Sequence, residues 1–333
     1  MSRVLSLYFL ALLLSYIGIE QTIAMAATKI TSNRGIFMIL SPAKTLDLSP
    51  LSSTISEQIA DCLSPAECDV EKTRILVDIM KSTSQKQLKD MLKVSDNISA
   101  TVKDYYEKYQ TNVDTTEKNA KPAVFSFDGP AFKGISASTC SEDTLKYMQT
   151  YLRIIDPLFG ALPPMSLIQP YRLEMATKKI LEDLDTDEKS LASWWKSSVT
   201  SSILKDMKAA DGTVCVNLAS DEYSSAVDAG VLNDNGCKFV KIVFQQEGRV
   251  IAVHAKRARG LMVRYIAENQ VENVKEIQNF DVEGYSYCED KSDETTIVFD
   301  RSKNWKDDVT AGDVKKRKTS GNTSSKKSSR RKI

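Results

Sequence analysis

Polar side chains gather after the ends of two predicted strands and beside a proline break. Strand ends that lead into helices are where binding sites collect in sheets of the α/β type, so we expect these side chains to form one polar pocket. Arginine and lysine in such a pocket can bind an anion while a carboxylate serves as a base. A set of ion pairs and helix caps without chemistry is the alternative. The pocket residues are Lys44, Arg172, Glu174, Asn217, Asp221 and Glu222.

Four basic side chains lie on one predicted helix, which runs from about Lys256 to Asn269. At 100° per residue, the apolar side chains between them fall within an arc of about 100°, so one face can pack while the rest presents positive charge. Such a surface suits phosphate contacts, which position a protein on nucleic acid without selecting a sequence. An ordinary solvated helix face is the alternative. The four residues are Lys256, Arg257, Arg259 and Arg264.

The segment from Asp156 to Pro164 has one glycine between apolar residues, and we interpret it as a turn between two helices. Such a helix-hairpin-helix-like element can point backbone N–H groups at a phosphate, and its turn would present Phe159 and Gly160. The fit is partial, because Pro170 would end the second helix early. A surface turn between packed helices is the alternative.

Several familiar kinds of site have no support in the sequence. His254 is the only histidine, and no two of the six cysteines form a CxxC pair, so the usual zinc spacings are absent. The sequence also lacks GxxxxGK[ST], GxSxG and HExxH. We therefore predict neither a metal nor a cofactor. Buried free thiols are favoured over disulfides, because a chain of this size can bury a core without cross-links.

Charge is distributed unevenly along the 333 residues, whose net charge is +1. The stretch from Lys315 to the end holds nine Lys and Arg and no acid, which leaves a net charge of −8 on the rest of the chain. A polyanion would therefore need a local cluster of positive charge on the body. Residues 302–333 are expected to be a disordered basic tail. We predict that this tail binds nucleic acid or acts as a nuclear-localisation signal. A tail that only increases solubility is an equal alternative.

The first 37 residues resemble a targeting segment. An apolar run from Val4 to about Ile19 precedes Ala24-Met25-Ala26, the small residues of a signal cleavage site. Residues 27–37 contain no acid, which suits a transit peptide behind a signal peptide and hence a plastid or the secretory pathway. An uncleaved anchor or a plain linker is the alternative, as is a cytoplasmic or nuclear protein if translation starts at Met38. No membrane span is predicted after removal of the leader.

Between residues 38 and 301, short strands and helices are mixed without regular alternation. We therefore predict an α+β fold, with one compact mixed α/β domain over residues 38–301. Strands are expected at 37–40, 123–127, 214–218, 238–245 with 249–255 as a hairpin, and 284–288 with 295–299. Helices are expected over 71–109, over 142–155 behind a Ser141 cap, and over 190–204 and 256–269.

Five segments, in order along the chain, resemble the bacterial peroxide-stress family YaaA. The similarity covers roughly residues 38 to 301, and Met38 coincides with the start of the bacterial proteins. The segments are Met38–Asp47 (MILSPAKTLD), Gln169–Met175 (QPYRLEM), Asn217–Tyr223 (NLASDEY), Ala258–Met262 (ARGLM) and Phe280–Tyr285 (FDVEGY).

The resemblance implies a single-domain fold with a basic cleft and a helix-hairpin-helix-like element. It also implies binding to double-stranded DNA with little sequence preference, and a role in hydrogen peroxide stress linked to limiting free iron. We place the hairpin at Leu158–Leu162 and the cleft at Lys44, Arg172 and the four basic residues of the helix. The alternative is an uncharacterised enzyme that acts on a small anion in the polar pocket.

Overall fold

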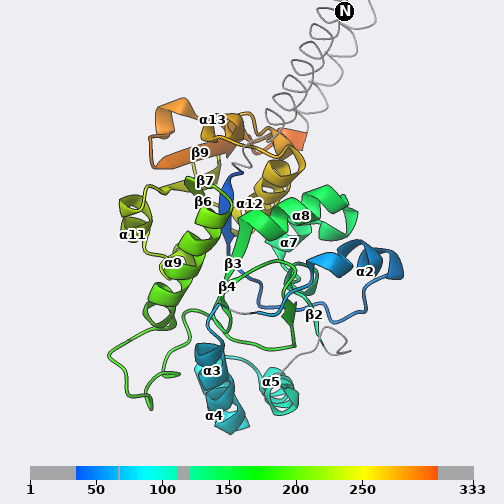
Figure 1. Cartoon of the computed structure of the whole chain (residues 1–333), viewed down its shortest axis with the longest axis vertical. Helices are drawn as coiled ribbons and strands as arrows, with labels where there is room; N and C mark the ends of the chain where they lie inside the picture. The colour runs from blue at the N-terminus through cyan, green and yellow to red at the C-terminus, as the bar shows by residue number, and fades with distance from the viewer. Residues whose placement is uncertain (1–34, 67, 111–119, 307–333) are drawn as a thin grey trace, which may run out of the picture. The chain divides into compact units, whose positions relative to one another are not determined.

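A seven-stranded sheet runs through the body of the protein (Figure 1). The computed structural model describes residues 35–66, 68–110 and 120–306. The strand order is β4-β3-β1-β6-β7-β9-β8, and the five inner strands are parallel while β4 and β8 are antiparallel edges. The strands are β1 (Phe37–Leu40), β3 (Leu152–Asp156), β4 (Gly160–Leu162), β6 (Val214–Leu218), β7 (Lys238–Gln246), β8 (Ser286–Tyr287) and β9 (Thr296–Arg301).

Strand β1 lies between β3 and β6, and all four of its residues are buried. Met38 pairs with Leu152 on one side and with Val216 on the other. A strand that is covered on both faces needs an uninterrupted apolar run, which explains why β1 and β6 were predictable from the sequence. The strand predictions for residues 37–40 and 214–218 are confirmed.

Helices cover both faces of this sheet, as in a three-layer α/β protein. Helices α9 (Leu191–Ala209) and α11 (Ala229–Asp234) lie on one face, and α8 (Glu142–Tyr151) and α12 (Ala252–Glu268) lie on the other (Figure 1). The predicted cap at Ser141 is confirmed, because its side chain accepts from Thr144 N. Helix α9 begins at a similar cap, where Ser190 accepts from Ser193 N. The six cysteines are free thiols, as the sequence favoured.

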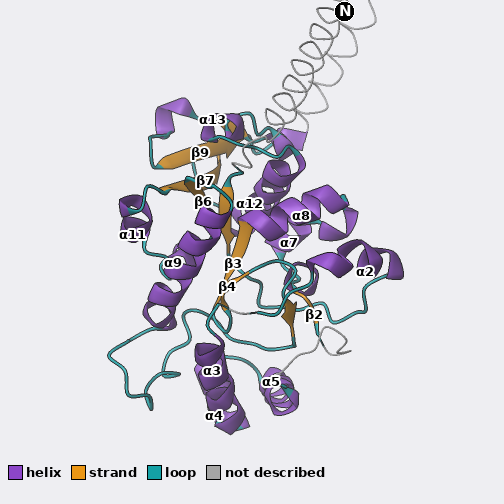
Figure 2. Cartoon of the chain, viewed as in Figure 1, coloured by secondary structure: helices purple, strands orange, loops and turns teal. Residues whose placement is uncertain are grey.

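A second group of helices lies beyond the end of the sheet (Figure 2). The predicted helical stretch 71–109 is three helices, α3 (Val70–Ser82), α4 (Gln85–Leu92) and α5 (Asp96–Lys108), because Ser84 and Ser95 start new ones as caps. The remaining elements are short: α2 (Ser53–Ile59), η1 (Ala60–Cys62), β2 (Lys121–Pro122), α6 (Ala123–Ser126), α7 (Pro130–Ile135), η2 (Ala137–Thr139), β5 (Leu167–Ile168), α10 (Asp221–Ser224), α13 (Val274–Ile277), η3 (Val282–Gly284) and η4 (Glu289–Lys291).

Three predictions of local structure were wrong. Residues 123–127 contain the short helix α6 instead of a strand, helix α8 ends at Tyr151, and residues 252–255 begin α12 instead of completing a hairpin. Short apolar runs cause these errors, because continuous hydrophobicity fits a buried strand and a buried helix equally well. The paired strands predicted near 284–299 are confirmed as β8 and β9.

The predicted single mixed α/β body is confirmed, since Gly35 onward forms one unit. The predicted α+β class did not include a mainly parallel sheet, which the structure has. The predicted targeting segment lies almost wholly outside the described residues, as does the predicted basic tail, so both remain predictions. Among the helices of the described ranges, none is long and apolar enough to cross a membrane.

Helices α7 and α12 are in backbone contact, and glycine permits it on both sides. A Cβ atom added to Gly260 would lie 1.7 Å from the carbonyl oxygen of Ala131. A Cβ atom added to Gly134 would lie 2.4 Å from the carbonyl oxygen of Arg257. Both distances are far below van der Waals contact, so neither position tolerates a side chain. This contact fixes where α12 directs its basic side chains.

Candidate functional site

The main candidate site is a cavity of about 310 Å³ at the carboxyl ends of β1 and β6. The chain leaving β1 reaches β3 on one side, while the chain leaving β6 reaches β7 on the other, so the two connections diverge there. Such a topological switch point is where ligands bind in open parallel sheets. The walls are residues 40–45, residues 128–132, the start of α10 with Ser220 and Glu222, and Lys256 and Arg259 from α12.

Two serines join the strand ends at this cavity. The backbone N–H of Ser220 donates to Ser41 Oγ at 2.9 Å, and the two hydroxyl oxygens are 3.4 Å apart. The loop after β1 is held against the segment before α7, since Asp128 N donates to the carbonyl of Thr45 at 2.8 Å. The hydroxyls and the loop backbone therefore stand at defined positions in the wall.

Arg259 is the most unusual side chain in the wall. Burial lowers the pKa of its guanidinium, an effect that the charge of Asp221 opposes, but Asp221 is itself bound to Lys241 at 2.6 Å. The Nε atom of Arg259 is buried without a hydrogen-bond partner, and the guanidinium forms no ion pair within the described ranges. A buried cation without a partner is costly, because it loses hydration and gains nothing in return. An anion in the cavity would supply the missing partner.

Three residues of the predicted polar pocket form one ion-pair network. Lys44 Nζ lies 2.5 Å from Glu174 Oε2, and Arg172 Nη2 lies 3.4 Å from Glu174 Oε1. The backbone carbonyl of Arg172 accepts from the hydroxyl of Tyr106 at 3.2 Å. Of the three, Lys44 lines the cavity directly, and Glu174 holds it in place from behind. The sequence prediction that these residues lie together is supported by this geometry.

The other three predicted pocket residues have different surroundings. Glu222 lines the cavity, and its Oε1 accepts from the backbone N–H of Ala176 at 3.1 Å. Asp221 is directed to Lys241 instead. Asn217 is buried, and its Oδ1 accepts from Ala219 N at 2.8 Å, so it shapes the end of β6 and is not open to a ligand.

The basic residues of α12 do not form one surface. Arg257 Nη2 lies 2.7 Å from Glu283, and Arg264 Nε lies 2.8 Å from Glu268. Both arginines also donate to backbone carbonyls near α7. Only the exposed Lys256 and the part-buried Arg259 face the cavity. The predicted basic helix is thus divided between paired arginines and cavity residues.

The interpretation of Leu158–Leu162 as a hairpin between helices is wrong, because β3 and β4 form a β-hairpin there. Phe159 is buried and packs edge-on against Tyr171. Gly160 has a φ of +72°, and an added Cβ would lie 2.8 Å from the ring of Trp195. Both residues are therefore part of the core and cannot contact DNA in this structure.

Asp156 ends β3 and is a buried charge that the sequence did not reveal. Its Oδ1 accepts from the backbone N–H groups of Leu158 and Phe159 at 2.8 and 3.0 Å, and its Oδ2 accepts from the hydroxyl of Tyr171. Burial raises the pKa of this carboxyl to about 6, although the three hydrogen bonds oppose the shift. The sequence analysis interpreted Asp156-Pro157 as the end of a helix and so assigned no role to this carboxylate. An aspartate whose side chain accepts from the backbone of a turn is the other common role of Asp at such a position.

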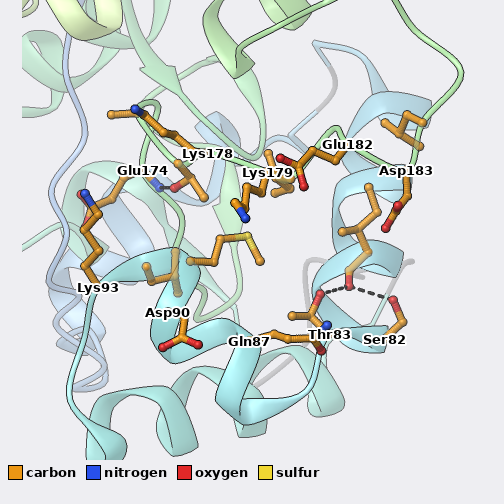
Figure 3. Close-up of a pocket in the computed structure, with 17 residues that line it drawn as sticks. Ser82, Thr83, Gln87, Asp90, Lys93, Glu174, Lys178, Lys179, Glu182 and Asp183 are labelled. Carbon is orange, nitrogen blue, oxygen red and sulfur yellow. Dashed lines mark hydrogen bonds between the residues drawn. The ribbon is translucent and has the colours of Figure 1, made fainter.

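A larger cavity of about 980 Å³ lies between α3, α4 and residues 174–184. Figure 3 shows Lys93 and Glu174 at one end of it and Asp183 at the other. Its other charged side chains are exposed and of both signs. It therefore gives a weaker chemical signal than the switch-point cavity with its unpartnered arginine. Glu174 lines this larger cavity and binds Lys44, which lines the switch-point cavity.

Comparison with known proteins places the chain in a family. The family model described as "Peroxide stress protein YaaA" matches residues 36–291. A UPF0246 protein of Aliivibrio fischeri strain MJ11 is 37% identical over 274 residues, which cover 80% of this chain and 98% of that protein. A UPF0246 protein of Acaryochloris marina is 37% identical over 272 residues, covering 80% of this chain and all of the relative. The chain belongs to the YaaA family.

Three of the five segments that carried the YaaA resemblance line the switch-point cavity, and a fourth contacts a residue of its wall. Residues 38–47 form β1 and the loop with Lys44, residues 217–223 form the end of β6, and residues 258–262 contain Arg259 and the helix contact at Gly260. Residues 169–175 supply Glu174, which holds Lys44. Segments far apart in the sequence of this YaaA member thus build a single site.

Proposed function

We propose that this member of the peroxide-stress family binds a small anionic ligand in the switch-point cavity. The observation that carries the proposal is Arg259, a part-buried cation that lines the cavity and has an unpartnered Nε atom. A buried charge that stays unpaired destabilises the fold, and such groups persist where a ligand completes them. The volume of about 310 Å³ fits a small metabolite.

The surrounding groups also suit an anion. Lys256 from the same helix and Lys44 from the loop after β1 bring two more positive charges to the walls. Ser41 Oγ accepts from the backbone N–H of Ser220 and lies 3.4 Å from Ser220 Oγ, so one hydroxyl proton of this serine pair can be donated to an oxyanion. Charged donors around a small cavity form the shorter and stronger kind of hydrogen bond to phosphate or carboxylate.

Calorimetric titration of the full chain with inorganic phosphate tests the proposal. Arg259→Met should weaken binding by roughly ten- to hundredfold, since a hydrogen bond to a charged group contributes about 1.5–3 kcal/mol. Arg264→Met is the matched control, because that arginine lies on the same helix but is paired with Glu268. Equal affinities for phosphate in the wild type and Arg259→Met would contradict the proposal.

DNA binding and an effect on free iron remain predictions that follow from the family resemblance. The geometry favours the small anion, since Arg257 and Arg264 are ion-paired and the Leu158–Leu162 hairpin is buried. Binding of a DNA duplex at several salt concentrations tests the DNA hypothesis. The logarithm of the binding constant falls with the logarithm of the salt concentration, and each phosphate contact makes this slope steeper by about 0.9. A slope that is unchanged in an Arg257→Met/Arg264→Met double variant would exclude these two arginines as phosphate contacts.

A further inference from the structure

Two carboxylates line the switch-point cavity among its cations, and one of them forms no ion pair. Asp128 is bound to Lys133 at 3.1 Å, whereas Glu222 is not paired. Glu222 lines the cavity together with Lys256 and Arg259. Its Oε1 accepts from the backbone N–H of Ala176, which fixes the orientation of the side chain. Within the described ranges, no cation lies within salt-bridge distance of Glu222, whereas Lys44 of the same cavity is paired with Glu174.

A free carboxylate in an anion-binding cavity has a clear consequence for the ligand. Its negative charge opposes the binding of a purely anionic molecule, and the exposure of Glu222 to solvent keeps this repulsion moderate. The carboxylate attracts a molecule that carries a hydrogen-bond donor or a positive charge at the matching end. The position of Glu222 therefore selects among anions, and it does not simply oppose binding.

Glu222 and Arg259 belong to different walls of the cavity. Glu222 lies on α10 after β6, whereas Arg259 lies on α12, whose position is set by the glycine contact with α7. The acid whose charge acts on Arg259 is Asp221, which is directed toward Lys241 outside the cavity lining. Glu222 thus offers a separate binding group for a second part of the ligand.

We propose that the ligand is a zwitterion, with its anionic group at Arg259 and Lys256 and an ammonium group that donates to Glu222. This inference rests on the proposed anion-binding function. The cavity of about 310 Å³ is at the small end of ligand sites, which suits an aminoalkyl phosphate or an amino acid better than a nucleotide. A phosphate and a carboxylate share this recognition chemistry, and the test uses the phosphate.

The test compares O-phosphoethanolamine with ethyl phosphate, two probes that differ mainly in the ammonium group. Both are titrated calorimetrically into the full chain at pH of about 8, where the amine is still protonated. The wild type should bind phosphoethanolamine about tenfold more tightly or better, as expected for one additional charged hydrogen bond. In Glu222→Gln this preference should disappear through weaker binding of phosphoethanolamine, while ethyl phosphate binds as well as before or better.

The amide of Glu222→Gln still accepts from Ala176 N, so the local structure is preserved. Glu268→Gln, on an exposed pair with Arg264, should keep the wild-type preference. Equal affinities for the two probes in the wild type would overturn the zwitterion inference and leave the anion site standing. A preference that survives in Glu222→Gln would also overturn it. If the wild type binds neither probe, the anion site itself is wrong and the inference falls with it.

Discussion

Arg259 and Arg264 lie little more than one turn apart on α12, yet their surroundings are opposite. Arg264 is paired with Glu268 and donates to Thr139 Oγ1 at 2.6 Å, so its charge is satisfied within the protein. Arg259 is part-buried in a cavity wall with an unpartnered Nε. The difference shows that a run of basic residues is not a basic surface. What matters is which acids the neighbouring elements bring to each side chain.

The largest effect should come from separating α12 from α7, the contact that places Arg259 in the cavity. Gly260→Ala puts a methyl group 1.7 Å from the Ala131 carbonyl, so the two helices must move apart. We expect a loss of about 3 kcal/mol or more in the free energy of unfolding, measured in urea. Gly212→Ala is the control, since its nearest neighbour would be at 3.6 Å. If the two variants are equally stable, the contact does not position the helix.

A second test compares Arg259 with Asp156, a buried carboxylate that accepts three hydrogen bonds. The pKa of Asp156 is raised from 3.8 to about 6, so the folded protein holds this proton more tightly than the unfolded chain. Its contribution to stability is therefore full below pH of about 4 and is lost as the pH rises through about 6. The stability difference between wild type and Asp156→Asn should change by about 3 kcal/mol over this window.

This pH effect is measured by urea unfolding of both proteins at several pH values. Tyr171→Phe keeps the carboxyl but removes one of its donors, so its pH-dependent loss should be at least as large as in the wild type. A stability difference between wild type and Asp156→Asn that is constant from pH 4 to 7 would show that Asp156 has an ordinary pKa in the folded protein.

The third test concerns the stability cost of the unpartnered arginine. In buffer free of oxyanions, Arg259→Met should raise the free energy of unfolding by about 1 kcal/mol, because it replaces an uncompensated charge by an apolar group of similar length. Thermal unfolding of both proteins measures this. A lower melting temperature for Arg259→Met would mean that Arg259 has an internal partner and that the contrast with Arg264 is not real.

The smallest effect is expected for the ion pair of Arg264 with Glu268. Glu268→Gln removes this i,i+4 pair, which is partly exposed and screened by salt, and leaves the hydrogen bonds of Arg264 to Ile135 O and Thr139 Oγ1 in place. We expect a loss within about 1 kcal/mol in urea unfolding, smaller at high ionic strength. A much larger loss, or one that does not respond to salt, would assign Glu268 a structural role beyond this pair.

Local signals were enough to predict much of the fold. The apolar runs of β1 and β6, and the serine cap of α8, depend only on neighbouring residues. The wrong predictions lie where local signals are ambiguous. The apolar residues of Leu152–Asp156 continue the pattern of α8, so a helix was predicted there, whereas this segment is strand β3. The parallel sheet depends on pairing between strands far apart in the chain, which periodicity does not encode.

The sequence predicted only part of the site. Arg259 was predicted as a DNA contact and not as a pocket residue, and Glu174 was selected because it lies beside a proline break. The strand-end rule selected Lys44 and Glu222, which line the cavity. It did not reveal that Glu283 would pair with Arg257 from 26 residues away, or that Asp156 would be buried. Long-range partners decide which charges remain available, and they are set by packing.

The most direct test of the anion site is a crystal of the full chain soaked in tungstate, a heavy tetrahedral oxyanion whose position is given by its anomalous scattering. We predict a peak in the cavity within hydrogen-bonding distance of the Arg259 guanidinium. Tungstate bound beside Arg257 or Arg264 with no peak at Arg259 would contradict it.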